Sequence, residues 1–304
     1  MNEKSINYSI VDVFTDQRFS GNPLAVIHDG RDLTTEEMQQ IATEFGFSET
    51  SVICPPKDSS TNAHVRIFTA TEEIPFAGHP NIGTAFVVAN EKTAARLEDS
   101  KNLIFDEKGG MVKVTLKSEN GNTNGSEIIA PQGLEIIGNC DPELMARCLG
   151  LSSSSITTST NLPCVATIGL PFAFVEVSKV GDLADIKINL NEFNKAAAIG
   201  PETIDGFTIC VFAIIEKSDH EISLRSRVLS PLGHPAEDPA TGSASGALGA
   251  FLAQKYDKAP ITINITQGVE MGRKSDITIH LSQLTSPPTI SGNCVKVSQG
   301  VIYI

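Results

Sequence analysis

The sequence predicts an α+β protein with two pseudo-symmetric domains, each an antiparallel, barrel-like sheet wrapped around a central helix. Short strand-like runs are many, whereas convincing long helices are few. Each half also contains one helix that is apolar on nearly every face, and such a helix must be surrounded by other elements. A similar motif precedes both helices, at residues 78–85 and 237–244, which indicates two related halves. A curved sheet around each helix satisfies all three observations.

The first half of the chain reads as strands interrupted by two helices. Thr34 and Glu37 form a capping signal, and the apolar positions that follow recur at helical spacing until about Gly46. The first repeated motif leads into a helix expected at 80–90. Alternating or apolar runs with turn signals between them predict strands at 8–14, 24–27, 51–54, 63–69, 103–105 and 111–116.

The second half mixes strands and helices in a similar way. Helices are expected at 142–149 and at 239–254, the second of which follows the second motif. The polar, turn-rich stretch 118–126 is the best candidate for a domain boundary. We therefore expect an N-terminal domain of residues 1–126 with a returning strand in 290–304, and a C-terminal domain of residues 127–289. Strands are expected at 164–168, 173–177, 207–215, 261–265, 277–281, 294–298 and 301–304.

The composition indicates an ordinary globular protein, and its charge does not exclude a small anionic substrate. The 304 residues are 40% hydrophobic and 19% charged, and they suffice for two domains. A net charge of -13 repels phosphates, which argues against nucleic acid and anionic membranes as partners. The sequence lacks both a signal-peptide core and a run of transmembrane length, so a cytoplasmic location is expected.

Cofactor and metal motifs are missing from the sequence. The six cysteines are scattered without C-x-x-C spacing, which predicts buried free thiols rather than disulfides or a zinc site. No phosphate-binding loop, dinucleotide fingerprint or H-E-x-x-H motif is present, and residues 242–246 have Ala where a nucleophile elbow needs Ser. Glu49, His79 and Asp238 come from three loops with no metal-ligand spacing. We expect neither a cofactor nor a metal.

The repeated motif suggests an anion site. His79 and Asp238 hold equivalent places in the two copies, each directly before a Pro that is expected to start its helix. The N–H groups and the positive dipole at a helix start attract anions. Thr84 and Ser243 can add hydroxyl hydrogen bonds. Ordinary capped helix starts are the alternative, but caps do not require the shared Gly-Thr/Ser-Ala pattern.

Two further residues are candidates for the chemistry. Glu49 falls between a helix and an apolar strand, where burial would suit a carboxyl group to general acid or base catalysis. A plain surface glutamate in a turn is the alternative. Arg273 lies in a turn between Gly268 and the strand at 277–281, where it either anchors a carboxylate or only decorates a hairpin.

Together these motifs resemble the PhzF (phenazine biosynthesis-like) family, of the diaminopimelate epimerase fold superfamily. They occur in family order along almost the whole chain. Ala70 is a small departure, because the family often has Pro there. The resemblance rests on D-V-F-T at 12–15, S-G-N-P-L-A-V at 20–26, S-E-T at 48–50, P-F-A-G-H-P at 75–80, E-D-P-A-T-G-S-A at 237–244, and Q-G at 267–268 with M-G-R at 271–273.

The resemblance implies two epimerase-like domains with the site in the cleft between them, and commonly a homodimer. A family member isomerises trans-2,3-dihydro-3-hydroxyanthranilate without a cofactor, by a glutamate that moves a proton between two carbons. That glutamate corresponds to Glu49, and His79 and Asp238 would assist it. Substrate-binding residues are expected at Ser20, Asn22, Gly78, Thr84, Gly242, Ser243 and Arg273.

Three functions remain open on the sequence. The first is a cofactor-independent isomerase that shifts a proton on a small, carboxylate-bearing, cyclic or amino acid-like metabolite. The second is an epimerase of an amino or hydroxy acid, although related epimerases use two cysteines and neither motif contains one. The third is a catalytically silent protein of the same fold that binds a ligand or a partner.

Overall fold

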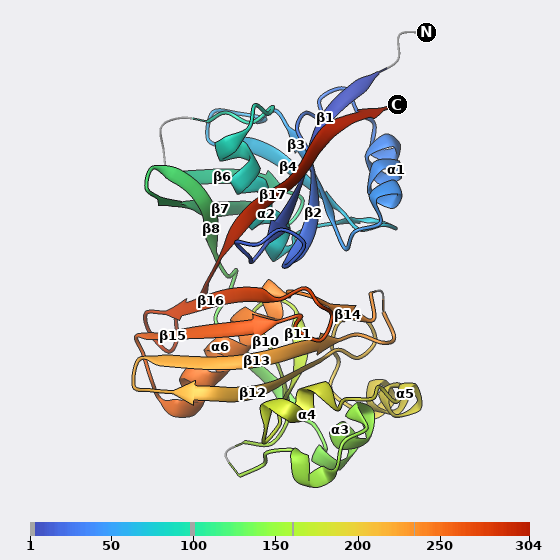
Figure 1. Ribbon diagram of the computed structural model, residues 1–304, viewed down its shortest axis with the longest axis vertical. Coiled ribbons are helices and arrows are strands. Elements are labelled where there is room, and N and C mark those ends of the chain that lie inside the picture. Colours follow the sequence, from blue (N-terminus) through green and yellow to red (C-terminus); the bar gives the residue numbers. More distant parts are fainter. Residues whose placement is uncertain (1–3, 98–100, 160, 234) are drawn as a thin grey trace. The chain divides into compact units, whose positions relative to one another are not determined.

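The computed structural model describes residues 4–97, 101–159, 161–233 and 235–304, which form two compact units (Figure 1). The N-terminal unit comprises residues 1–128 and 291–304, and the C-terminal unit comprises residues 129–290. The boundaries expected from the sequence lie at 126/127 and 289/290.

The N-terminal unit consists of strands and two helices. Its elements are β1 (Ser5–Val13), β2 (Asn22–Ile27), α1 (Thr35–Phe45), β3 (Thr50–Cys54), β4 (Ala63–Phe68), β5 (Glu73–Ile74), α2 (Gly78–Asn90), β6 (Asn102–Glu107), β7 (Gly110–Glu119), β8 (Asn122–Ile129) and most of β17 (Thr289–Tyr303). The expected capping box of α1 is present, because Thr34 and Glu37 exchange hydrogen bonds.

Eight strands of this unit close into a barrel. Following the pairing around it, the order is β1, β2, β3, β4, β6, β7, β8 and β17, and β17 pairs with β1 again. The sheet is not wholly antiparallel as predicted, because β2–β3 and β4–β6 are parallel pairs. The reason is that α1 and α2 lie in the two crossovers that connect these strands.

Helix α2 lies inside this barrel and fulfils the prediction of a central buried helix. It contacts β1, β2, β3 and β7, and its buried residues occupy every face. The strands of the barrel approach α2 most closely where it has Gly83. A Cβ atom there would lie 2.6 Å from Leu24 Cδ2 and 2.8 Å from Val13 Cγ2. Small residues in this helix are therefore a packing requirement of the narrow barrel.

The C-terminal unit repeats much of this pattern. Its elements are β9 (Glu135–Asn139), α3 (Pro142–Leu149), η1 (Ser153–Ser155), β10 (Cys164–Thr167), β11 (Pro171–Glu176), α4 (Val180–Ala184), α5 (Leu190–Ile199), β12 (Ile209–Lys217), β13 (Glu221–Leu229), β14 (Glu237–Asp238), α6 (Gly242–Tyr256), β15 (Ile261–Gln267) and β16 (Ser275–Leu281). Helices α4 and α5 were not predicted.

The strand pairings of the two units match one for one. In the N-terminal unit β2–β3 is parallel, β3–β4 antiparallel, β4–β6 parallel and β6–β7 antiparallel. In the C-terminal unit β11–β12, β12–β13, β13–β15 and β15–β16 follow the same sequence of directions. The central helix α6 contacts β10, β11, β15 and β16. The fold predicted from the sequence, two pseudo-symmetric α+β halves around central helices, is confirmed.

One local prediction needs correction, and one segment is more ordered than its composition suggested. The polar stretch 118–126, the boundary candidate, belongs to the β7–β8 hairpin, which turns at Asn120 and Gly121, both with positive φ; the division between the units lies just beyond it at 128/129. The stretch is polar because residues 118–122, at the end of the hairpin, are exposed. The expected starts of the repeat helices are also shifted: α2 begins at Gly78 instead of residue 80, and α6 begins at Gly242 instead of residue 239.

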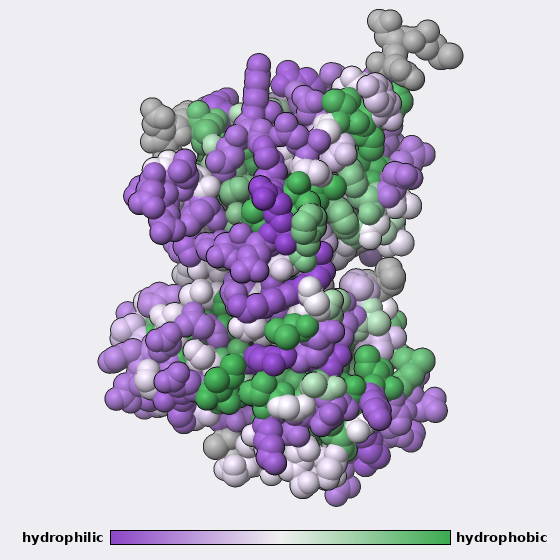
Figure 2. Space-filling model, in the orientation of Figure 1, coloured by the Kyte–Doolittle hydropathy of each residue, from purple (hydrophilic) through white to green (hydrophobic). Residues whose placement is uncertain are grey.

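Apolar side chains gather inside the two units. The six cysteines are free, five of them buried and Cys54 partly exposed, as predicted. Hydrophilic side chains cover most of the face shown in Figure 2. Among the described residues, no helix is long and apolar enough to span a membrane.

Candidate active site

The strand register corrects how the two motif copies correspond. Phe68 pairs with Glu73, and Leu229 pairs with Glu237, at the same place in each unit. The related segments are therefore Glu-x-Pro-x-x-Gly-His at 73–79 and Glu-x-Pro-x-x-Gly-Ser at 237–243. The register assumed from the sequence was five residues off, because the first copy contains two Pro-x-x-Gly segments, at 75–78 and 80–83, and either can be aligned with the segment at 239–242.

In the correct register His79 corresponds to Ser243 and not to Asp238. His79 and Ser243 are each the second residue of a central helix, after Gly78 and Gly242. Both helix starts thus present a polar side chain next to N–H groups that have no partner within the helix. Asp238 lies on β14, four residues before α6, and its counterpart in the N-terminal unit is Ile74.

Glu49 and His79 come together in the N-terminal unit. Glu49 immediately precedes β3, and its Oε2 atom lies 3.5 Å from Nε2 of His79 on α2. The side chains are 19% and 7% exposed, so this pair is largely shielded from water. The structure thus brings a carboxylate and an imidazole together at the start of a buried helix.

Asn22 lies beside the loop that carries Glu49, and Ser20 belongs to the 14–21 loop that leads into β2. Asn22 is the first residue of β2, is 1% exposed, and accepts a 3.4 Å hydrogen bond from Ser48, the neighbour of Glu49. Gly21 has a φ of +66°, and a Cβ there would lie 2.3 Å from the carbonyl oxygen of Val13. This glycine is therefore required where the 14–21 loop turns into β2.

Asp238 forms a separate polar cluster in the C-terminal unit. Its Oδ2 atom accepts a 2.5 Å hydrogen bond from Oγ1 of Thr241, the N-cap residue of α6. Gln267, which is fully buried, donates from Nε2 to the Asp238 carbonyl at 2.7 Å and to Thr241 Oγ1 at 3.2 Å. Its Oε1 accepts from the Thr241 backbone N–H at 3.2 Å. The amide of Gln267 therefore ties β14 to the start of α6.

Arg273 lies in a turn next to this cluster. Gly268 has a φ of +73°, and a Cβ there would meet the Arg273 carbonyl at 2.4 Å and the Pro239 carbonyl at 2.6 Å. The backbone N–H of Arg273 donates to the carbonyl of Gly268 at 3.0 Å. The turn that carries Arg273 is thereby held against the residue that follows Asp238.

Thr84 does not fit the role expected for it. It is the seventh residue of α2, is 0% exposed, and its Oγ1 lacks a hydrogen-bond partner. A substrate at the helix start has no path to this hydroxyl, because the side chain points into the barrel interior. Its assignment from the sequence followed from the shifted register, which equated Thr84 with Ser243.

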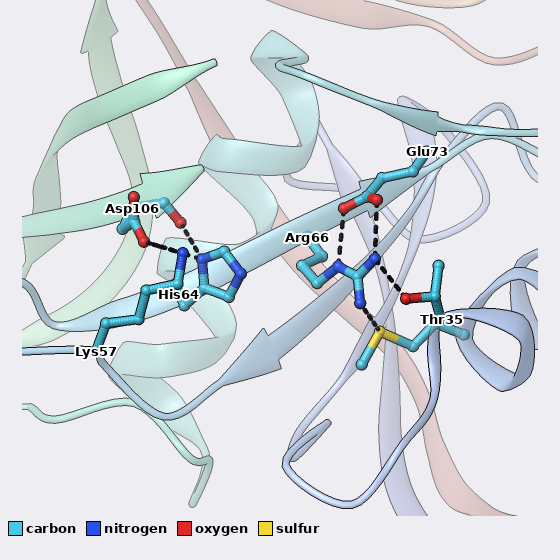
Figure 3. A network of polar contacts seen from close by, with 7 residues as sticks. Thr35, Lys57, His64, Arg66, Glu73 and Asp106 are labelled. Carbon is cyan, nitrogen blue, oxygen red and sulfur yellow. Dashed lines mark hydrogen bonds and ion pairs between the residues drawn. The ribbon is translucent and has the colours of Figure 1, made fainter. Parts of the chain in front are cut away.

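Each unit also braces its site with an arginine–glutamate pair. In the N-terminal unit Arg66 of β4 binds Glu73 of β5 through two 2.8 Å hydrogen bonds (Figure 3). These bonds hold the pKa of Glu73 below its ordinary value. Arg227 binds Glu237 with the same atoms and the same distances. The pairs fix the short strands that lead into the two central helices.

The sequence reasoning missed two residues beside the helix starts. Gln267 was quoted in a motif but given no role, and Glu107 was not considered. The shared Arg66 and Arg227 mark corresponding strands, but loops of different length follow them, so the correspondence of Glu107 and Gln267 emerges only from the strand pairing. Among the described residues, no group of three or more His, Cys, Asp or Glu side chains is arranged to hold a metal ion.

Two matching α+β units, each around a central helix, define a fold class that includes solved epimerases and PhzF-family proteins. The hydroxyproline epimerase of Agrobacterium vitis has this fold, with a TM-score of 0.62 over all of this chain and 92% of the other, at 13% identity. A PhzF-family protein of Bacillus anthracis is more similar, with a TM-score of 0.83 over 99% of this chain and all of the other, at 23% identity.

Within this class the chain belongs to the phenazine biosynthesis-like family, PhzC-PhzF, whose model matches residues 11–300. Trans-2,3-dihydro-3-hydroxyanthranilate isomerase of Pseudomonas chlororaphis is 32% identical over 98% of this chain and 99% of its own length. An uncharacterized isomerase of Mesorhizobium japonicum is also 32% identical, with the same coverage. These relatives place the chain among the isomerases of the family.

Proposed function

We propose that the protein relocates a proton within a small, carboxylate-bearing metabolite, without a cofactor, and that Glu49 carries the proton. The observation that supports this most is the contact of Glu49 with His79 at the start of α2, where both side chains are largely buried. The carboxylate is the proton carrier, and the imidazole orients it and exchanges hydrogen bonds with the substrate.

The chemistry follows from charge. Removing a proton next to a carboxylate or a conjugated system generates negative charge on the substrate. The N–H groups and dipole at the start of α2, where Gly78 and His79 lie, stabilise such charge without rearranging. Because Glu49 is 19% exposed, the proton that it takes up exchanges in part with solvent before the carboxyl group returns it to a second carbon, so product formed in D2O carries deuterium there.

The C-terminal unit supplies the second part of the proposed site. Gly242 and Ser243 offer N–H and hydroxyl donors at the start of α6, and Asp238 offers an acceptor held by Thr241. We propose that these groups and Arg273 bind the polar substituents of the substrate. That they meet Glu49 in one cleft stays a prediction, as does the dimer.

The substrate class comes from the chemistry and from a relative. The Pseudomonas relative is named for trans-2,3-dihydro-3-hydroxyanthranilate, a cyclic amino acid. We propose a cyclic or amino acid-like carboxylate for this chain as well, and the family name by itself assigns no phenazine pathway.

The test is proton exchange with solvent. The wild-type protein is incubated in D2O with a panel of cyclic and amino acid-like carboxylates that includes the substrate of the relative, and deuterium incorporation is followed by NMR. Glu49→Gln should lower exchange by about 10²-fold or more, the contribution expected of a general acid–base group. Binding of the same compound should change little. Glu44→Gln, the same substitution at an exposed position on α1, is the matched control.

The stereochemistry of the product separates the remaining alternatives. A shifted double bond with deuterium at a new carbon supports isomerisation, whereas inversion at one carbon supports the epimerase. Undiminished exchange in Glu49→Gln contradicts the role of Glu49. Binding without exchange in the wild type contradicts the enzyme and leaves the ligand-binding protein.

A further inference from the structure

Glu107, the last residue of β6, is a buried carboxyl group outside the contacts described so far. It is 5% exposed, and neither of its carboxyl oxygens has a hydrogen-bond partner of normal geometry. The amide of Asn81, in the first turn of α2, lies close enough to influence the pKa of Glu107. A buried carboxyl group without a cation is expected to be neutral.

Asn81 links this carboxyl group to the start of α2. Its side chain is fully buried, and Nδ2 donates a 3.0 Å hydrogen bond to the carbonyl of Ala77, the N-cap residue. Its Oδ1 lacks a donor. A protonated Glu107 provides an O–H group for that oxygen, whereas an ionised Glu107 provides only acceptors. An ionised Glu107 can still accept from the second N–H of the Asn81 amide, but only the protonated form also gives Oδ1 a donor.

The internal repeat shows what this position does in the other unit. In the parallel pair of β4 and β6, His64 lies opposite Asp106, so Val65 lies opposite Glu107. Val65 precedes Arg66 just as Ser226 precedes the equivalent Arg227, and in the parallel pair of β13 and β15 Ser226 lies opposite Gln267. Gln267 is therefore the counterpart of Glu107. Its amide makes three hydrogen bonds that tie β14 to the N-cap of α6. A protonated carboxyl group has the shape and the donor–acceptor pair of that amide.

The surroundings favour the neutral form. Burial is the main cause that raises the pKa of Glu107 to about 8; the hydrogen bond from the amide of Asn81 opposes it, and the charge of Asp106 adds a smaller increase. Asp106 is itself paired with Lys57 at 2.7 Å and His64 at 3.1 Å (Figure 3). The neighbouring elements carry further charged or titratable groups: Arg66 on β4, Glu73 on β5, His79 on α2, Lys108 in the turn to β7, and Lys113, Lys117 and Glu119 on β7.

We propose that Glu107 is a positioning residue that, in its neutral form, holds the first turn of α2 and with it the place of His79 beside Glu49. A second link supports this geometry, because Gly109, in the turn after Glu107, donates a 2.9 Å hydrogen bond to the carbonyl of Pro75 ahead of α2. Ionisation puts a charge beside the Asn81 oxygen and loosens the turn. Only the effect on turnover rests on the proposed function.

The primary test reads the position of His79 without any substrate. The ring signals of His79 are followed by ¹⁵N NMR from pH 6 to pH 10 in the wild type and in Glu107→Gln. The wild type should show a step near pH 8, and Glu107→Gln should lack it while keeping the wild-type signals of pH 7. Glu119→Gln, an exposed change on β7, should retain the step.

A reciprocal variant uses the repeat as a control. Gln267→Glu should create a comparable alkaline step in the backbone amide signal of Ser243, which the wild type lacks. A step in His79 that persists in Glu107→Gln overturns the proposal. So does a Glu107→Gln protein whose His79 signals are displaced at pH 7, because the neutral amide should substitute for the neutral acid.

Activity supplies a second, separate readout. With an exchanging substrate, kcat of Glu107→Gln should match the wild type at pH 7 and exceed it about tenfold at pH 9, where about a tenth of Glu107 remains protonated in the wild type. An NMR step without this rate difference limits Glu107 to structure and overturns its effect on turnover. Failure of the Glu49 test leaves the NMR result unaffected, so the two proposals fail separately.

Discussion

Replacing Glu107 by Gln should stabilise the N-terminal unit, and the gain should grow with pH. In the folded protein burial raises the pKa of this carboxyl group to about 8, whereas its ordinary value is 4.5. Between these two values the folded state holds a proton that the unfolded chain has released. The wild type therefore loses stability as the pH rises through this window. The Gln side chain does not titrate, so the variant does not lose stability in this pH range.

The magnitude follows from the width of the window. One pH unit corresponds to about 1.4 kcal/mol for a single proton, so a window of about 3.5 units corresponds to about 5 kcal/mol at most. Relaxation of the barrel and water entry lower this value, and we expect about 2–4 kcal/mol. The difference between the two proteins should vanish near pH 4, rise up to pH 8 and stay constant above it.

Amide hydrogen exchange measures this quantity for one unit at a time. Peptides from β1–β4 report the free energy of opening of the N-terminal unit, and peptides from β12–β15 serve as an internal control. Glu107→Gln should slow exchange in the first set only, and increasingly so from pH 5 to pH 8. Parallel pH profiles of the two proteins would refute a neutral buried Glu107. A stabilisation that is independent of pH would indicate better packing and not proton linkage.

Three other substitutions test the packing around the site. Gly83→Ala should destabilise by about 1–2 kcal/mol in urea unfolding, because overpacking against the barrel wall outweighs the gain in helix propensity; Gly181→Ala on α4, with open space around it, should be neutral or stabilising. Glu73→Gln should lower the free energy of unfolding by about 1–3 kcal/mol, since it leaves the partly buried Arg66 with a weaker partner. Unchanged stability would show that the pair does not contribute to it. Gln267→Ala should raise KM more than it lowers kcat, because it loosens binding groups; an equal fall in kcat and kcat/KM would contradict this.

The fold was predictable because it depends on how apolar residues are distributed along the helices and strands. A helix that is apolar on every face requires a wall around it, and the residues of α2 and α6 satisfy this condition on inspection. The parallel pairs β2–β3 and β4–β6 were not predictable from alternation, because parallel and antiparallel strands of a barrel bury the same face. Their direction follows from the crossovers, which only the complete order of elements reveals.

The site was predicted in part. Glu49 and His79 were chosen from local sequence, and the structure places them in contact. Thr84 was misassigned because the first motif contains two Pro-x-x-Gly segments. Either segment can be aligned with the single Pro-x-x-Gly of the second motif, and local sequence does not choose between the two alignments. Glu107 and Gln267 were beyond local reasoning, because each reaches its helix start from a strand more than 20 residues away in the sequence.

The repeat itself argues for a division of labour between the two units. Thr50 and Ile209 hold equivalent places opposite β4 and β13, so the residue before each, Glu49 and Thr208, also correspond. Likewise His79 corresponds to Ser243, and Glu107 to Gln267. At all three positions the N-terminal unit has a titratable side chain, and the C-terminal unit has a neutral hydrogen-bonding side chain.

Such one-sided divergence fits a reaction with one proton carrier better than a reaction with two. A racemase that works on both faces of a carbon needs a base from each half, which would preserve titratable groups at equivalent positions. Asp238 does not supply a second base equivalent to one in the N-terminal unit, because its counterpart is Ile74. Its carboxylate also already accepts a hydrogen bond from the hydroxyl of Thr241. We therefore expect Asp238→Asn to weaken binding while retaining most of the deuterium exchange at saturating substrate, whereas Glu49→Gln should lower exchange by about 10²-fold or more.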